Sequence, residues 1–186
     1  NKPIKLNGKY LVEKIINDIN KIKEISKIFI STTDKKLEKS IIGKKIIILQ
    51  RDKDLQKKFL GLEYVLSKTY SRYIKKLKPS HVMVAEEIYL NRPKNFFQSI
   101  INNFDDNYES IVPIFKNNSN NIWKKDDSGA MQPLFKTSLP SEFVDHKIYE
   151  EAKGLGTLVK AETFENSGRE SNSQKFIEID KKMWEN

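Results

Sequence analysis

The sequence predicts an α/β fold whose sheet is doubly wound and mostly parallel. Over residues 1–115, short apolar runs alternate with longer segments in which apolar residues recur at helical spacing. Segments of that length between strands favour parallel crossovers, with helices on both faces of the sheet. The 186 residues contain no internal repeat and no clear linker, so we expect a single domain. Sheets of this class bind ligands at the carboxyl ends of their strands.

Four short apolar runs are expected to form the strands of this region. In chain order they are residues 27–31, 45–49, 81–85 and 110–115. Each run is short and almost continuously apolar, which is typical of a strand that is buried on both faces. Pro113 lies within the last run and has no backbone N–H to donate, so we expect that strand near an edge of the sheet.

Four helices are expected before and between these strands. Their apolar stripes cover residues 11–22, 34–42, 54–77 and 93–104. Thr33 or Asp34 is a suitable N-cap for the second helix, and Gly43 ends it. The third helix is expected to be long, with Phe59 at the start of its stripe and Pro79 stopping it. Pro93 is expected to open the fourth.

The pattern changes after Lys116. Turn-forming residues dominate two stretches of the segment 117–140, which we expect to form a hairpin or an excursion from the domain. The remaining expectations are a short helix or loop at 141–151, strands at 155–161 and 175–179, a polar loop at 165–174 between them, and a last helix beginning at 181.

Composition excludes several classes of function. There is no Cys, so disulfide scaffolds, thiol catalysis and Cys-based zinc sites are ruled out, and two His residues cannot make a multi-histidine metal cluster. No signal peptide is evident and no apolar run approaches the roughly 20 residues that span a bilayer. We therefore expect a cytoplasmic protein with no membrane partner. No P-loop, G-x-G-x-x-G or G-x-S-x-G motif occurs.

The net charge of +9 has two readings. It could reflect a polyanionic partner such as nucleic acid. The sequence favours the other interpretation, a composition rich in Lys, Asn and Ile of the kind that an AT-rich genome produces, because the lysines are spread from Lys2 to Lys182. Few residues could read bases bidentately, and no aromatic residues alternate with Arg, so no specific nucleic-acid partner is expected.

Two acidic residues near the end of the chain are candidate metal ligands. Glu178 and Asp180 end the last expected strand, and the two-residue period points both carboxylates to the same face. Mg²⁺ prefers such oxygen ligands. They could also be solvated acids that are partnered by Lys181 and Lys182.

Other polar residues follow the expected strands. Ser31 and Asp34 lie in a loop that could present N–H groups to a phosphate, although Asp34 could be a simple N-cap. Arg92 follows the third strand and could bind a carboxylate or phosphate bidentately, or form a structural ion pair. Arg169 precedes the last strand and is a candidate for an anionic ligand. His146 follows Asp145 and could shuttle a proton or simply be exposed.

Four segments together resemble the cytidylyltransferases that activate acidic sugars, which include the acylneuraminate and spore-coat-polysaccharide enzymes. Asn1-Lys-Pro-Ile-Lys-Leu-Asn-Gly-Lys-Tyr-Leu11 is similar to the run that leads into that family's first helix. Lys27-Ile-Phe-Ile-Ser-Thr-Thr-Asp34 resembles its strand and turn ending in Ser-Thr-Asp, with one extra Thr. Arg51-Asp-Lys-Asp-Leu55 and Ile177-Glu-Ile-Asp180 are similar to two later motifs, in the same order and at similar spacing.

The resemblance implies a nucleotide-diphospho-sugar-transferase-like fold and a reaction. CMP would pass from CTP to a sugar hydroxyl with Mg²⁺ assistance and pyrophosphate release, for surface glycan synthesis. Carried over by motif, Asp180 would be the catalytic metal ligand with Glu178 as the second, and Asn1 would end the nucleotide loop. Residues 117–140 would be the candidate dimerisation element, and CTP and a sugar acid the partners.

The resemblance also implies that the family's first strand and phosphate-binding loop would lie before Asn1, so residues 1–186 alone are expected to be inactive. Glu178 stands where the family has Asp, and Val84–Pro93 lacks its Thr-Ser pair. Three alternatives follow: a degenerate, non-catalytic binding module in glycan synthesis, a basic nucleic-acid-binding domain, and a transferase that uses nucleotide-sugar donors.

Overall fold

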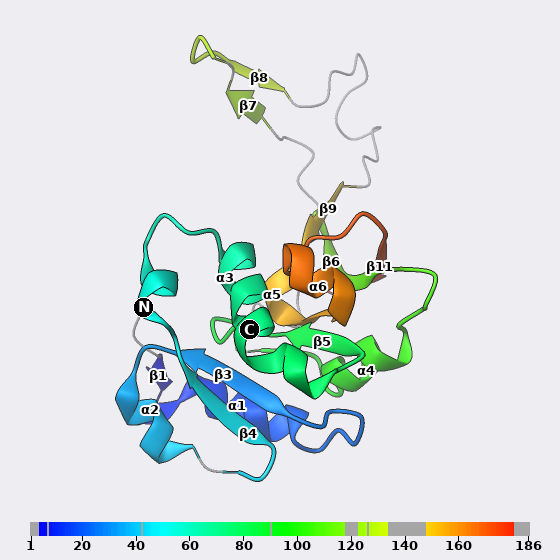
Figure 1. Ribbon diagram of the computed structural model, residues 1–186. Coiled ribbons are helices and arrows are strands. Elements are labelled where there is room, and N and C mark those ends of the chain that lie inside the picture. The colour runs from blue at the N-terminus through cyan, green and yellow to red at the C-terminus, as the bar shows by residue number, and fades with distance from the viewer. Residues whose placement is uncertain are drawn as a thin grey trace.

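The computed structural model describes residues 4–6, 8–41, 43–89, 91–117, 123–125, 127–133 and 148–180 (Figure 1). The expected α/β class is confirmed, because helices and strands alternate and two pairs of neighbouring strands, β3–β4 and β6–β11, are parallel. In the described residues, no helix combines the length and the apolar character that crossing a membrane requires.

Two separate sheets carry the fold. The smaller sheet pairs β3 (Ile28–Thr32) in parallel with β4 (Ile46–Gln50). The larger sheet has the order β11-β6-β10-β5, with β9 alongside β6. Its strands are β5 (His81–Val84), β6 (Ser110–Asn117), β9 (Ile148–Glu151), β10 (Thr157–Lys160) and β11 (Gln174–Glu178).

The direction of the strands determines which of them end at the same edge of the larger sheet. β10 is antiparallel to both β5 and β6, and β11 is parallel to β6. Therefore β5, β6 and β11 all run in one direction and end at the same edge. Two further pairs lie outside these sheets: β1 (Lys5–Leu6) with β2 (Lys9–Tyr10), and β7 (Trp123–Lys125) with β8 (Met131–Pro133), a described part of the expected excursion.

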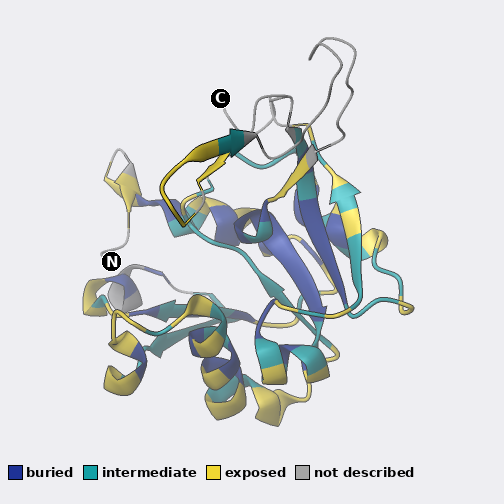
Figure 2. Ribbon diagram, turned by 90° about the horizontal axis from the view of Figure 1, so that it is seen from above, coloured by how far each residue is buried: buried dark blue, intermediate teal, exposed yellow. Residues whose placement is uncertain are grey.

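The helices pack apolar faces against the sheets. They are α1 (Leu11–Ile19), α2 (Lys35–Ser40), α3 (Leu62–Thr69), α4 (Phe96–Asn102), α5 (Lys153–Gly156) and α6 (Ala161–Ser167). The main core joins both sheets, since Ile16, Ile30, Phe97, Ile111 and Leu158 belong to one cluster of buried residues. In Figure 2 the buried residues lie in the interior of the ribbon and exposed residues lie on its outer helix faces.

The prediction of one long helix over residues 54–77 is wrong for the first part of that range. A short 3₁₀ helix, η1 (Lys53–Gln56), is followed by non-helical residues, and α3 begins only after Gly61. Phe59 is 81% exposed, so it does not belong to the buried stripe. Gly61 is in an extended conformation and is the N-cap residue of α3, so the helix begins only after it. Beyond α3 the helix continues as a π turn, η2 (Tyr70–Ile74), and a 3₁₀ turn, η3 (Lys75–Leu77), and it ends before Pro79 as expected.

The expectation that Pro113 marks an edge strand is also wrong. β6 is a central strand, with β11 on one side and β10 and then β9 on the other. β10 pairs with Ser110 and Ile111, whereas β9 pairs from Ile114 onward. Pro113 lies at the change of partner, where its carbonyl accepts the N–H of Ala152. A residue without an N–H is tolerated there because no ladder bond requires one.

Three smaller expectations need correction. The fourth helix begins at Phe96 rather than at Pro93, after Asn95 in a left-handed conformation. Residues 148–151 form strand β9, where a short helix or loop was expected. The polar loop at 165–174 begins inside helix α6. The helix expected from residue 181 lies outside the described residues.

Candidate functional site

The loops that follow the strands carry the candidate residues. Glu86 and Glu87 follow β5, and the Ile4 N–H donates to Glu87 Oε2 at 3.5 Å. This contact brings the start of the described chain to the carboxyl end of β5. Burial raises the pKa of Glu87, and the hydrogen bond from Ile4 opposes that rise.

The structure brings Ser31 next to Arg51, which follows β4. The Arg51 Nε donates to the Ser31 hydroxyl at 3.3 Å and its Nη2 donates to the Ser31 carbonyl at 3.4 Å. Asp34 accepts the N–H of Lys36 at 2.7 Å, and the Asp34 N–H donates to the Thr32 hydroxyl at 3.1 Å. Asp34 is therefore the N-cap of α2, and this polar turn is fixed by its own hydrogen bonds.

A second cluster holds the loop after Arg51. The Arg72 guanidinium, on η2, donates to Asp52 at 2.6 Å and to both carboxylate oxygens of Asp54 at 3.0 and 2.6 Å. The Tyr73 hydroxyl donates to Asp52 at 2.7 Å. Hydrogen bonds from Tyr73 and Arg72 lower the pKa of Asp52, and the one from Arg72 lowers the pKa of Asp54.

The Arg92 guanidinium donates hydrogen bonds to backbone carbonyl groups of the protein. Its Nε donates to the carbonyl of Leu155 at 2.6 Å, and Nη2 donates to the carbonyls of Glu86 and Gly154 at 2.9 and 3.2 Å. Nη1 donates to the carbonyl of Tyr89. Burial lowers the pKa of Arg92 to about 10. The side chain ties the loop after β5 to α5, and its donors do not face an incoming anion.

Arg169 is likewise satisfied by protein groups. It is 5% exposed, and its Nη1 donates to Glu86 Oε1 at 2.6 Å. Its Nε and Nη2 donate to Glu63 Oε1 at 3.0 and 2.7 Å, and its backbone N–H donates to Glu63 Oε2 at 2.6 Å. Burial alone would lower the pKa of Arg169, but the bonds to Glu63 and Glu86 outweigh it and raise the pKa. The residue joins α6, α3 and the end of β5.

Glu178 and Asp180 are both exposed at the end of β11. The strand order places β11 at the opposite side of the larger sheet from β5, so these acids stand away from Glu86 and Glu87. Among the described residues, no group of three or more His, Asp or Glu side chains could hold a metal ion. Asn1 lies outside the described residues.

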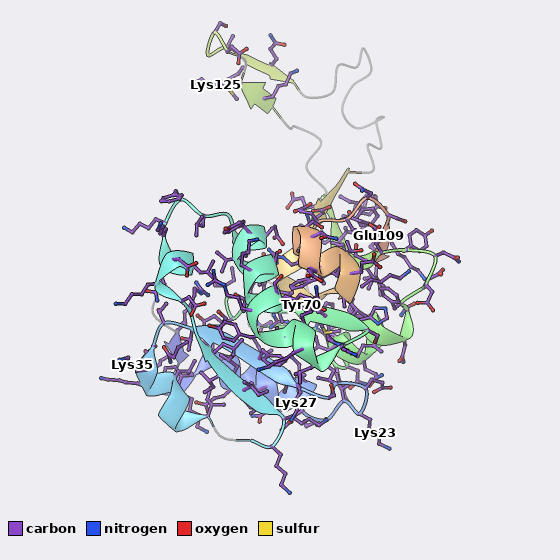
Figure 3. All side chains as sticks on the ribbon, viewed as in Figure 1. Lys23, Lys27, Lys35, Tyr70, Glu109 and Lys125 are labelled. Atoms are coloured by element: carbon purple, nitrogen blue, oxygen red, sulfur yellow. The ribbon has the colours of Figure 1, made fainter. Side chains whose placement is uncertain are left out.

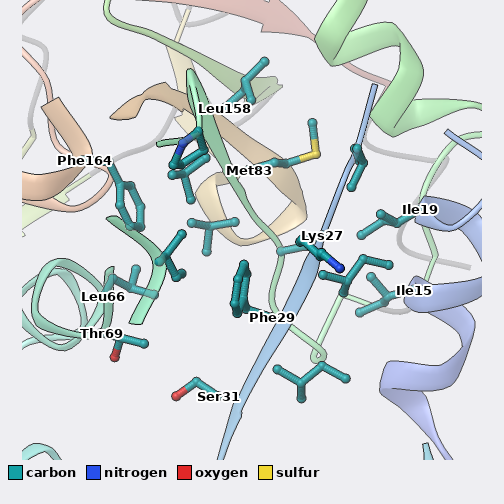
Figure 4. Close-up of a pocket in the computed structure, with 18 of the residues that line it drawn as sticks. Ile15, Ile19, Lys27, Phe29, Ser31, Leu66, Thr69, Met83, Leu158 and Phe164 are labelled. Carbon is teal, nitrogen blue, oxygen red and sulfur yellow. The ribbon is translucent and has the colours of Figure 1, made fainter. Parts of the chain in front are cut away.

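A large cavity lies between β3 of the smaller sheet and β5 of the larger sheet. Its volume is about 1160 Å³, and its lining includes side chains of β3 and β5. Figure 4 shows Phe29 and Ser31 of β3, with Met83 of β5, around this space. The sequence offered no signal for it, because it depends on how β3 and β5 are placed. The Ser31–Arg51 contact could have been predicted, since both residues end neighbouring parallel strands.

Comparison with known proteins was made by sequence and by structure. The sequence matches no protein-family model and no curated protein. Among solved structures, 4-diphosphocytidyl-2C-methyl-D-erythritol synthase from Anaerococcus prevotii matches with a TM-score of 0.64 and 12% identity, over 95% of this chain and 79% of that chain. The bifunctional IspDF from Campylobacter jejuni matches with a TM-score of 0.61 and 15% identity, over 94% of this chain and 43% of that chain.

A third solved structure is CMP:2-keto-3-deoxy-manno-octonic acid synthetase complexed with CTP. It matches with a TM-score of 0.59 and 9% identity, over 95% of this chain and 82% of that chain. These identities are low, so the likeness concerns the fold. It confirms the nucleotide-diphospho-sugar-transferase-like α/β architecture that the sequence predicts.

Proposed function

We propose that the protein is a nucleotidyltransferase that moves CMP from CTP to an acidic 2-keto sugar and releases pyrophosphate, in surface glycan synthesis. The observation that carries the proposal is the fold, which matches over 95% of this chain a synthetase solved with CTP. The four sequence motifs that resemble acidic-sugar cytidylyltransferases support it independently.

In this reaction an oxygen of the sugar attacks the α-phosphate of CTP. A new P–O bond forms to the sugar, the bond to pyrophosphate breaks, and the proton of the attacking hydroxyl passes to solvent water. Catalysis of such a step consists mainly of positioning and of neutralising charge on the phosphate oxygens. We assign nucleotide binding to the turn containing Ser31 and Asp34, whose hydrogen bonds to Arg51 and Lys36 hold it in one conformation.

We propose that a magnesium ion binds at the end of β11. Mg²⁺ is usually held by one or two carboxylates, substrate phosphates and several waters, so two accessible acids are sufficient. Glu178 and Asp180 are both exposed there, and the Glu178 side chain has no partner among the described residues. When bound, the ion would neutralise charge on the phosphates. We assign Asp180 as its catalytic ligand and Glu178 as the second.

Arg92 and Arg169 take a different role in this proposal from the substrate binding that the sequence predicts. Both guanidinium groups already donate to protein carbonyls or carboxylates. They act as positioning residues that fix the loops after β5 and before β11.

The test is pyrophosphate release by protein expressed from the complete natural gene, with CTP, Mg²⁺ and a panel of 2-keto sugar acids. We expect release that requires CTP, Mg²⁺ and one of these acids. Absence of release across the panel contradicts the proposal. CTP binding without turnover would then support the degenerate binding module instead.

A variant pair tests the assigned metal ligand. Asp180→Asn should lower kcat by roughly 100-fold, the scale of losing one electrostatic group at a reacting centre. Asp127→Asn, an exposed acid in the β7–β8 hairpin turn, is the matched control and should leave kcat unchanged. Equal kcat values for the two variants would remove Asp180 from the site.

A further inference from the structure

The segment that links β4 to α3 carries the most exposed large apolar side chain in the described part of the chain. Phe59 is 81% exposed, and it belongs to neither cluster of buried residues there. It lies in a turn over residues 57–60, which the Leu60 N–H closes by donating to the Lys57 carbonyl at 3.2 Å. Figure 1 shows this stretch as an outer loop that leads into α3. We call residues 57–60 the tip turn.

The tip turn is held in place on both sides. Leu55 before it and Val65 after it are buried, with 3% and 6% exposure. The Gln56 side chain also donates to the Arg51 carbonyl at 2.6 Å. The fold therefore presents Phe59 to solvent on a fixed turn, so a partner that binds the ring has little chain entropy to remove.

Lysine side chains lie beside the exposed aromatic rings of this region. Lys57 and Lys58 are both exposed, and the Lys57 Nζ lies 5.8 Å from the ring centroid of Phe59. On α3, the Lys68 Nζ lies 5.4 Å from the ring centroid of Tyr64, which is 50% exposed. Cations and aromatic rings are thus interspersed on the tip turn and on exposed residues of the helix that follows it.

The acidic residues of this region are already bonded to arginines. Asp52 and Asp54 accept hydrogen bonds from Arg72, and Glu63 accepts them from Arg169. Among the described residues, the two lysines of the tip turn form no ion pair. The charge left to attract a partner to the tip turn is therefore positive.

This combination of ring and cations limits the kind of partner. A protein pocket that received Phe59 would also have to desolvate the ammonium groups beside it, which is costly. At a membrane surface, a lysine keeps its ammonium group among the lipid headgroups while an aromatic ring enters the boundary with the acyl chains. A second copy of the chain is disfavoured, because each copy carries a net charge of +9. An anionic lipid surface satisfies both the ring and the lysines.

We propose that the tip turn docks on an anionic lipid surface, with Phe59 inserted at the headgroup boundary and Lys57 and Lys58 at the lipid phosphates. The sequence predicts no membrane partner because it lacks a spanning run, but a surface contact needs no span. The ring and the lysines supply two modest attractions, which together give reversible binding. The inference does not rest on the proposed reaction.

Co-sedimentation with vesicles measures this contact. Vesicles of phosphatidylcholine with about one-third phosphatidylserine are compared with vesicles of phosphatidylcholine alone, at physiological salt. We expect the native chain to bind only the vesicles that contain phosphatidylserine. Phe59→Ala should weaken this binding by at least about fivefold, because the inserted ring is lost. The matched control is Phe176→Ala, which removes an exposed ring from β11 and should leave binding unchanged.

A pair of double variants tests the electrostatic part of the contact. Each lysine near an anionic leaflet is worth roughly fivefold in binding, so Lys57→Gln with Lys58→Gln should weaken binding by about 25-fold. Lys35→Gln with Lys36→Gln removes the same charge from exposed residues at the start of α2 and should change binding by no more than about twofold. All four lysines are exposed, so thermal unfolding should be the same in both proteins.

Three results would overturn the proposal. The first is failure of the native chain to bind the anionic vesicles, which would favour an acidic protein as the partner. The second is equal binding by Phe59→Ala and Phe176→Ala, because scattered lysines would then account for the contact. The third concerns insertion: the fluorescence of Phe59→Trp, above that of the native tryptophans, should shift to shorter wavelength on the anionic vesicles, and that of Phe176→Trp should not. An unshifted spectrum from vesicle-bound Phe59→Trp would exclude insertion.

Discussion

At the scale of single residues, Arg169 illustrates how a buried charge is kept. The guanidinium is almost completely removed from solvent, and Glu63 and Glu86 accept all the side-chain bonds described for it. Removing one partner of a buried ion pair leaves the others without compensation. Breaking a buried ion pair in this way costs about 3–5 kcal/mol. We expect Arg169→Ala to lower the free energy of unfolding by about 3 kcal/mol, at the lower end of that range, because both glutamate side chains keep some exposure to solvent.

Urea denaturation measures this loss. Arg169→Lys should recover little of it, since an ammonium group cannot reproduce the forked geometry toward two carboxylates. Arg72→Ala is the control: Arg72 also bonds two acids, but its side chain is 39% exposed, so the effect on stability should be slight. If the Arg169→Ala protein is stable but has a raised KM for the sugar acid, Arg169 binds the substrate, as the sequence predicts.

The titration of His81 leads to a prediction about how the free energy of unfolding depends on pH. Burial lowers the pKa of this imidazole, a smaller influence of Asp106 raises it, and Lys160 lowers it. The ring also packs edge-to-face on Phe104, with centroids 4.5 Å apart. Below the ordinary pKa of about 6.5, the unfolded chain takes up a proton more readily than the folded one.

The stabilising contribution of neutral His81 is thus complete above pH 6.5 or so and is lost as the pH falls through the lower pKa of the folded state. Unfolding free energies measured between about pH 7.5 and pH 5 should decrease with acidification. His81→Phe keeps an aromatic ring but cannot titrate, so its slope should be flatter. Parallel slopes in the two proteins would contradict the assignment.

At the scale of elements, Gly168 determines how α6 ends against α3. Its φ is +66°, and a Cβ there would lie 2.8 Å from the Glu63 carbonyl oxygen and 3.0 Å from its Cα. Gly168→Ala should therefore destabilise the fold by about 1–3 kcal/mol in thermal or urea unfolding. Gly61→Ala is the control, because a Cβ at Gly61 would meet no atom within 4 Å and the φ of this residue is −63°. Equal losses would disprove the steric argument.

Element by element, hydrophobic patterning predicts what local sequence determines. The apolar runs at β3, β4 and β5 are found within one residue of their expected starts. Patterning fails at residues 57–61, because a helical spacing that includes Phe59 is fortuitous when that residue is exposed. It also fails at Pro113, where the change of partner from β10 to β9 depends on residues far along the chain.

The positions of the candidate site residues could be predicted from the sequence about as well as the helices and strands. Strand ends indicate where Ser31, Asp34, Glu178 and Asp180 lie, since the rule for α/β sheets depends only on chain direction. The partners of Arg169 were not predictable, because Glu63 is 106 residues away in sequence. Such contacts are set by tertiary packing and leave no local pattern.

At the scale of the whole molecule, the positive charge is spread over the surface. Figure 3 shows Lys35 and Lys125 far apart, and both lie away from the neighbouring pair Lys23 and Lys27. Other lysines are neutralised within the fold: Lys75 bonds Glu165 at 2.6 Å, and Lys153 bonds Glu151 and Glu170 at 2.9 Å each. A nucleic-acid-binding surface instead gathers its cations along one face.

This distribution predicts weak and only mildly salt-dependent binding to DNA or RNA. Each phosphate that a protein neutralises adds about −0.9 to the slope of the logarithm of the binding constant against the logarithm of the salt concentration. An interface with roughly eight phosphate contacts therefore gives a slope of about −7. For the +9 chain with scattered lysines we expect a slope no steeper than about −2. Fluorescence anisotropy of a labelled duplex, from low to physiological salt, measures it. A slope typical of a dedicated interface would favour the basic nucleic-acid-binding domain over the nucleotidyltransferase, because an enzyme acting on CTP has no need to neutralise a run of phosphates.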